Sequence, residues 1–224
     1  QRVEEKLKDI NNNGRFLFFW NNRNARRKQS GALLFWFKEF LDKVGNDKAQ
    51  LLMHTDLNDP NGQPLAVIAE HLGLTKGEVV FSTMKVDPHH MADFYNMADC
   101  TLNISDAEGF GLATLESLSC ETPIIVNMTG GLQEQVTDGE NWFGIGINPA
   151  SKSIIGSLTV PWIYEDRINK EDFVEALTTM VNKPKKELLE LGKQGRAHVE
   201  KNYSFDKFNE SWISLMGETH EKYG

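Results

Sequence analysis

Cysteine is scarce in this chain of 224 residues, and so are long apolar runs. Cys100 and Cys120 belong to no C-x-x-C or Cys/His pattern, so we expect both to be inert thiols in buried elements. No run of 18 or more apolar residues occurs and no signal peptide opens the chain, so we expect no membrane span. Together these absences favour a reducing, cytoplasmic location.

An excess of basic residues is also lacking, because the formal net charge is −8 and the isoelectric point is about 5.3. A general nucleic-acid binder needs a basic face, so we expect no nucleic-acid partner. A small phosphorylated ligand needs only local positive charge. The six histidines show no metal-ligand spacing, and no GxxxxGK[ST] or GxGxxG motif occurs, so we predict no metal site and no kinase-type or dehydrogenase-type nucleotide site.

Short apolar segments alternate with amphipathic ones through the first two thirds of the chain. Strands are expected at 16–20, 50–54, 78–81, 100–104, 123–127 and 144–147. Helices are expected at 31–44, 65–72, 88–97 and 112–119, with a short one after Gly131 and three near the C-terminus. This alternation predicts an α/β fold with a parallel sheet covered by helices on both faces, whose ligands bind at the carboxyl ends of the strands.

The segment 106–116 is the most informative part of the sequence. Seven residues separate Glu108 from Glu116, among them Gly109 and Gly111, where a loop opens a helix. Backbone N–H groups at such a junction, together with the positive end of the helix dipole, form a site for anions. A carboxylate one turn into the helix can accept hydrogen bonds from a sugar beside the bound phosphate, so the segment predicts a nucleotide-sugar site.

Four segments in order match a known family: 16–23 followed by Lys28, the E-x7-E stretch 108–116, the pair 123–126 and 129–134, and Asp138-Gly139 with Gly144. Over most of residues 15–205 the chain resembles the family 4 retaining glycosyltransferases of GT-B fold, also called glycosyltransferases group 1. It departs from the family at Asn22, where glycine is usual, and in the segment 147–168, which is longer than usual. That segment, with Trp162 and Tyr164, could pack on the fold, cover the donor or meet another domain.

The resemblance implies the donor-binding half of a retaining glycosyltransferase, a Rossmann-like domain that forms one half of a GT-B fold. We expect a lead-in or linker at 1–14, a nucleotide-sugar-binding domain at 15–200 and a C-terminal helix at 201–224. An N-terminal domain that binds an acceptor sugar, lipid or protein is expected to be absent, which would leave the chain poorly active alone. Peripheral attachment to a membrane through that domain stays open.

The resemblance also implies roles for individual residues. Arg23 and Lys28 hold the donor diphosphate, Glu108 positions the sugar, and Glu116 accepts hydrogen bonds from the ribose. Glu108, Arg23 and Lys28 are the expected catalytic residues. The remaining donor-binding positions are Gly109, Phe110, Gly111 and Leu112 around the diphosphate and Met84, Lys85 and Val86 around the base. The donor would be UDP-, GDP- or ADP-linked, and no cofactor or metal is implied.

Plainer interpretations accompany each motif. The two glutamates can be ordinary helix residues, and the basic run after the first strand can be a solvated loop, in which Arg26 and Arg27 are assigned to the surface. Another GT-B enzyme, a sugar-nucleotide epimerase or a phosphorylase, is one alternative function. A non-catalytic nucleotide-sugar-binding module is another.

Overall fold

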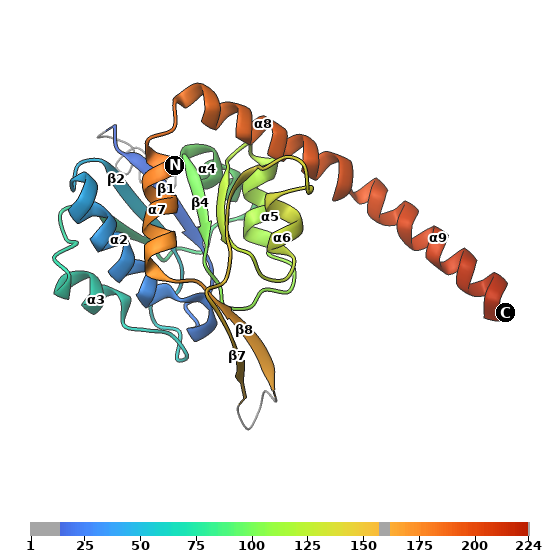
Figure 1. Ribbon diagram of the computed structural model, residues 1–224, viewed down its shortest axis with the longest axis horizontal. Helices are drawn as coiled ribbons and strands as arrows, with labels where there is room; N and C mark the ends of the chain where they lie inside the picture. Colours follow the sequence, from blue (N-terminus) through green and yellow to red (C-terminus); the bar gives the residue numbers. More distant parts are fainter. Residues whose placement is uncertain (1–13, 157–161, 224) are drawn as a thin grey trace.

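The computed structural model describes residues 14–156 and 162–223. Its centre is a parallel sheet with strand order β3-β2-β1-β4-β5-β6 (Figure 1). The strands are β1 (Phe16–Asn21), β2 (Ala49–His54), β3 (Val79–Ser82), β4 (Cys100–Asn103), β5 (Ile124–Asn127) and β6 (Gly144–Ile147). The helices are α2 (Ser30–Val44), α3 (Leu65–His71), α4 (Pro88–Met97), α5 (Leu112–Ser119), α6 (Leu132–Val136), α7 (Lys170–Val181), α8 (Lys185–Asn202) and α9 (Phe205–Tyr223), with a 3-10 turn η1 (Arg26–Lys28).

Both faces of the sheet are buried, which explains why β1 reads as an unbroken apolar run. Phe18 and Trp20 belong to the core cluster that includes side chains of α2, α3 and α7. Leu17 and Phe19 alternate with them and pack with Phe94 of α4 on the other face. On the same side, side chains of α5, α6 and α8 pack on β5. The predicted Rossmann-like architecture with helices on both faces is confirmed.

The predicted strands and helices of the sheet agree with the structure to within a residue or two at each end, and 88–97, 112–119 and 144–147 agree at both ends. The predicted lead-in at 1–14 lies, except for Gly14, outside the described residues. In the part of the chain that is described, no helix is long and apolar enough to cross a bilayer.

The segment 147–168 contains an antiparallel hairpin of β7 (Ser151–Ile155) and β8 (Ile163–Arg167) that the sequence analysis did not predict. Its base is fixed at the carboxyl ends of the main strands. Asn127 Nδ2 donates to Asp166 O (2.6 Å), and Asp166 N donates to Asp106 O (2.7 Å). The hairpin therefore projects from the same edge of the sheet at which ligands bind in this class of fold (Figure 1).

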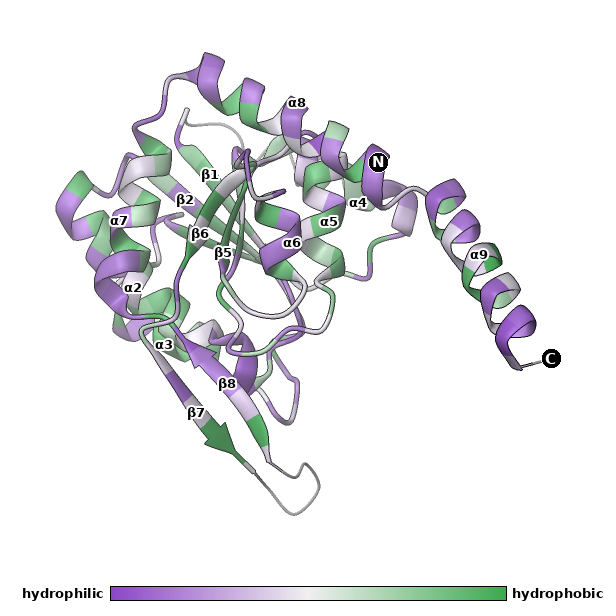
Figure 2. Cartoon of the chain, turned by 45° about the vertical axis from the view of Figure 1, so that its right-hand side comes forward, coloured by the Kyte–Doolittle hydropathy of each residue, from purple (hydrophilic) through white to green (hydrophobic). Residues whose placement is uncertain are grey.

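Helix α9 extends away from the sheet and has no buried residue (Figure 2). Its apolar side chains Phe205, Phe208 and Trp212 are all exposed to solvent. A C-terminal helix is present at Phe205–Tyr223, shorter than the predicted 201–224 because α8 runs to Asn202, and it contributes nothing to the core that positions the site.

Candidate functional site

A cleft of about 450 Å³ opens where β1 and β4 end. It is lined by Asn21, Asn22, Arg23, Lys28, Asn103, Glu108, Gly109, Phe110, Gly111, Leu112, Ala113 and Glu116. All the predicted site residues except Met84, Lys85 and Val86 are in this set. The ends of β1 and β4, the segments that follow them and the start of α5 supply the lining, because the carboxyl ends of neighbouring parallel strands meet at one edge of the sheet.

The loop from Glu108 to Gly111 is held against the segment that follows β5. A Cβ atom on Gly130, whose φ is +49°, would lie 1.7 Å from Glu108 O, so only glycine allows this approach. Gly131 N also donates to Gly109 O (3.2 Å). The glycine pair that the sequence analysis matched to the family therefore shapes the cleft without lining it.

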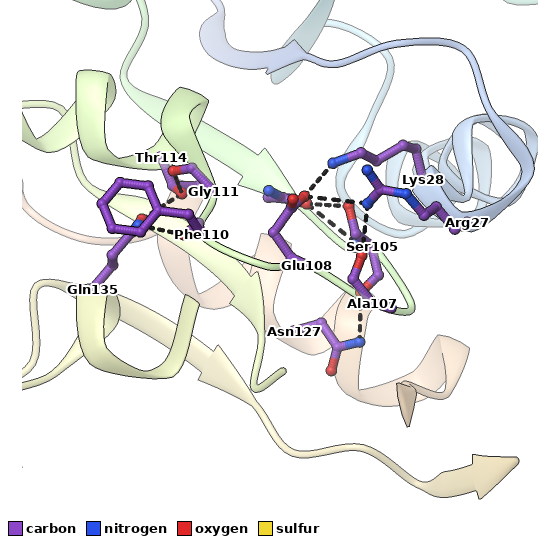
Figure 3. Close-up of polar contacts among 11 residues, drawn as sticks. Arg27, Lys28, Ser105, Ala107, Glu108, Phe110, Gly111, Thr114, Asn127 and Gln135 are labelled. Carbon is purple, nitrogen blue, oxygen red and sulfur yellow. Dashed lines mark hydrogen bonds and ion pairs between the residues drawn. The ribbon is translucent and has the colours of Figure 1, made fainter. Parts of the chain in front are cut away.

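Thr114 and Gln135 fix the start of α5 (Figure 3). Thr114 Oγ1 donates to Gln135 Oε1 (2.6 Å), and Gln135 Nε2 donates to Phe110 O (2.6 Å). Gly111 precedes the helix with a φ of +87°, and the first backbone N–H groups of α5 have no acceptor within the helix. These groups lie at the cleft, where they can bind an anion.

Lys28 and Glu108 form an ion pair in the cleft, and both side chains are largely buried (Figure 3). Burial lowers the pKa of the Lys28 ammonium below its usual value of 10.5, against the opposing effect of Glu108. Arg27 Nη1 lies 3.6 Å from Glu108 Oε2 and donates to Ala107 O (2.6 Å). Lys28, which is predicted to bind the phosphate, and Glu108, which is predicted to bind the sugar, thus form an ion pair with each other.

Arg23 is paired with Asp59, a residue of the loop between β2 and α3. The guanidinium binds both carboxylate oxygens, with Nη2 3.2 Å from Oδ1. Hydrogen bonds from Arg23 and from Asn61 N lower the pKa of Asp59 to about 2, so Asp59 is ionised at neutral pH. The second predicted phosphate contact therefore also has a carboxylate partner.

Glu116 lies on the exposed side of α5, where Tyr95 OH donates to its Oε2 (2.7 Å). Tyr95 itself is buried, and its hydroxyl accepts a hydrogen bond from Asn21 Nδ2 (2.9 Å). Burial raises the pKa of the Tyr95 phenol, so it remains a donor at any ordinary pH. This chain of contacts orients a carboxylate toward the cleft.

Met84, Lys85 and Val86 follow β3, which is the edge strand of the sheet and is separated from β1 by β2. Val86 packs against the cluster that contains Phe19 and Phe94. These three residues are not in the lining of the cleft, and their predicted contact with the base stays a prediction.

Arg26 and Arg27 lie at the surface, as the sequence analysis assigned them, and both also make polar contacts that it did not predict. Arg26 pairs with the fully buried Glu165 of β8, and Arg27 binds the loop that carries Glu108. Glu165 needs a cation because a buried carboxylate without a partner is strongly destabilising. The sequence analysis also missed four cleft residues, Asn21, Asn22, Asn103 and Ala113; only the departure of Asn22 from the family glycine marked one of them.

In the described ranges, no group of three or more His, Cys, Asp or Glu side chains could hold a metal ion. The positive charge of the cleft comes from Arg23, Lys28 and the N-terminus of α5. Such a set can hold an anionic group and stabilise negative charge that develops on it.

Comparison with known proteins agrees with this geometry. Residues 11–198 match the profile of the family "Glycosyl transferases group 1". A D-inositol 3-phosphate glycosyltransferase of Acidothermus cellulolyticus is 35% identical over 99 residues, which are 43% of this chain and 22% of that protein. The sucrose-phosphate synthase of Thermosynechococcus elongatus superposes with a TM-score of 0.71 at 20% identity, over 97% of this chain and 49% of that one.

An α,α-trehalose 6-phosphate synthase of Burkholderia multivorans superposes with a TM-score of 0.77 at 13% identity, over 97% of this chain and 45% of that one. The fold and site define a Rossmann-like domain with a cleft at the ends of β1 and β4, lined by cations and a helix N-terminus. The chain belongs to the glycosyl transferases group 1 family. It spans about half the length of these two structures and less of the curated relative.

Proposed function

We propose that the chain is the donor-binding half of a retaining glycosyltransferase and holds a nucleotide-diphospho-sugar in the cleft. One observation carries the proposal: Arg23, Lys28, the N-terminus of α5 and the carboxylates Glu108 and Glu116 converge on a single cavity. Cations and backbone N–H groups suit a diphosphate, and carboxylates suit sugar hydroxyls. Each of these groups has the residue type that its proposed partner requires.

The chemistry breaks the bond between the anomeric carbon and a diphosphate leaving group and forms a bond from that carbon to an acceptor hydroxyl oxygen, whose proton leaves with the nucleoside diphosphate. Negative charge grows on that group as the bond breaks, and Arg23, Lys28 and the α5 dipole lower its energy. Glu108 positions the sugar through its hydroxyls, and we assign no nucleophile to the protein. To bind the donor diphosphate, Lys28 must leave Glu108 and Arg23 must leave Asp59. Each cation then contacts phosphate oxygens instead.

The acceptor is proposed to bind a second, N-terminal domain, as it does in a complete GT-B enzyme. The relatives are named for inositol phosphate, sucrose phosphate and trehalose phosphate products or substrates, and these differ from one another. The residues of the cleft therefore support only the class of the donor, a UDP-, GDP- or ADP-linked sugar. The acceptor is proposed to depend on the other domain.

A binding screen with product analysis tests the proposal. The chain is incubated with UDP, GDP, ADP and their common sugars, binding is followed by thermal shift, and the sugar of each bound donor is analysed by NMR. Binding of one nucleotide family, with the sugar either intact or slowly released with retained configuration, is the expected result.

Two outcomes would favour the alternatives. Conversion of the bound sugar into its epimer would assign the chain to the epimerases. Absence of binding to every nucleotide would contradict the proposal and favour a module that does not handle sugar nucleotides.

A further inference from the structure

The buried polar atoms that lack partners are concentrated at one edge of the sheet. In residues 14–156 and 162–223 these atoms are Trp20 Nε1, Asn22 Nδ2, Thr55 Oγ1, Asn103 Nδ2 and Asn127 Oδ1. Each belongs to the carboxyl end of β1, β2, β4 or β5, or to the residue or two just after it. A buried polar group without a partner costs free energy, so such a concentration marks a place where water or a ligand supplies the partners.

Asn22 and Asn103 differ from the other three residues because they also line the cleft. The orientation of Asn103 is fixed, since its Oδ1 accepts hydrogen bonds from Ser105 N (3.2 Å) and Ser105 Oγ (2.5 Å). The free end is therefore the NH₂ group, a donor. Asn103 is 1% exposed, so its NH₂ group has little access to partners outside the cleft.

We infer that the side-chain amides of Asn22 and Asn103 donate hydrogen bonds to the diphosphate of the donor, which makes them further binding residues of the cleft. The inference rests on the proposed function. Phosphate oxygens only accept hydrogen bonds, so they match two amide donors beside Lys28 and Arg23. Asn22 gives this chain a side-chain donor at the position where its family usually has glycine.

The Lys28–Glu108 ion pair lines the same cleft as the two amides. Both of its side chains are long and can rotate, and the ammonium must leave Glu108 to bind phosphate. A diphosphate that separates the pair enters the space that the two amides border. Its oxygens then satisfy both donors at once.

Asn103→Asp is the sharpest test, because an aspartate keeps an oxygen for Ser105 and replaces only the NH₂ group. At pH 8 we expect the affinity for the nucleoside diphosphate that binds wild type to fall about tenfold or more. Affinity for the parent nucleoside should not change. Asn22→Gly, which restores the family residue, should weaken diphosphate binding several-fold with the same selectivity.

Asn182→Asp is the matched control, since Asn182 borders a different cavity, beside Phe16 at the opposite edge of the sheet. It should leave both affinities unchanged. Equal diphosphate affinity in wild type and Asn103→Asp would overturn the inference, as would a loss confined to the sugar-bearing donors. If Asn103→Asp does not fold, unchanged binding by Asn22→Gly overturns it. Failure of wild type to bind any nucleotide refutes the proposed function itself.

Discussion

Tyr95 OH donates a hydrogen bond of 2.7 Å to Glu116 Oε2 across the gap between α4 and α5. The same hydroxyl accepts from Asn21 Nδ2, so a buried phenol on one helix sets the direction of an exposed carboxylate on another. This contact matters because Glu116 is the proposed partner of the ribose. Its geometry is fixed before any ligand arrives.

Removing the Tyr95 hydroxyl should weaken nucleotide binding, although Tyr95 does not line the cleft. In Tyr95→Phe, Glu116 loses its orienting donor, and we expect affinity to fall about three- to tenfold, or about 1 kcal/mol. Calorimetry with the ribonucleotide and its 2′-deoxy form measures the effect. The preference of wild type for ribose should shrink in the variant; an unchanged preference would show that Tyr95 does not act through Glu116.

In the proposed function, Asp59 competes with the donor diphosphate for Arg23. Replacing it by asparagine should tighten nucleoside diphosphate binding several-fold, because the guanidinium no longer leaves a carboxylate and one negative charge is removed from the neighbourhood. Asp56→Asn makes the same charge change in the same loop, where Asp56 caps only Asn58 N, and should have a smaller effect. Weaker binding in Asp59→Asn would mean that Asp59 positions Arg23 productively.

The buried ammonium of Lys28 should make nucleotide affinity depend on pH in the alkaline range. Burial lowers its pKa below 10.5, and only the ammonium binds phosphate, so affinity should fall as pH rises through that lowered value. Between the lowered pKa of Lys28 in the folded chain and its usual value of 10.5 in the unfolded chain, the unfolded chain binds more protons. The contribution of Lys28 to the free energy of unfolding therefore rises with pH in this range.

Titration of nucleotide affinity from about pH 7 to about pH 10.5 checks this prediction. Lys28→Met provides the control, because it removes the ammonium and keeps any titration of the base. Wild type should lose affinity over the range relative to the variant. Parallel pH profiles for the two proteins would show that Lys28 does not hold the phosphate.

Gly130 can be tested by the smallest substitution. A Cβ atom there would lie 1.7 Å from Glu108 O, so Gly130→Ala must displace the loop of Glu108. We expect a loss of about 1–3 kcal/mol in the free energy of unfolding, measured by denaturant, and loss of nucleotide binding. Gly217→Ala, in α9 with no neighbour within 4 Å, should be neutral or slightly stabilising. Wild-type binding by Gly130→Ala would contradict this account of the loop.

Much of the sheet could be predicted from the sequence because each strand is short, apolar and followed by a turn signal. The run at 16–20 predicted β1, and Pro88 with the stripe of Phe94 and Tyr95 predicted α4. The cleft followed from the parallel topology, since Arg23 and Glu108 both come after strands. For these elements, the local sequence pattern and the overall fold favour the same structure.

The hairpin β7–β8 could not be predicted in the same way. Its strands bury few apolar side chains: Ile154 of β7 and Tyr164 of β8 are exposed, so no core-facing alternation marks them. What holds the hairpin is long-range polar contact, above all the pair of Arg26 and Glu165, 139 residues apart. A sequence pattern carries no signal for such a pair.

The partners of the predicted site residues were equally hidden. Asp59 stands in a turn cluster that reads as an ordinary loop, and Asn103 reads as an ordinary residue of the predicted strand 100–104. Both depend on how separate loops meet at the sheet edge. Only the three-dimensional structure shows that the two predicted phosphate contacts are paired with carboxylates.

Calorimetric titration of wild type and Glu116→Ala with the nucleoside diphosphates tests the central claim most directly. Glu116 is exposed on α5, so the variant should fold as wild type does. We predict that wild type binds one nucleotide and that the variant binds it about tenfold more weakly or not at all. Equal binding by both proteins, or no binding by wild type, would contradict a nucleotide-sugar site in this cleft.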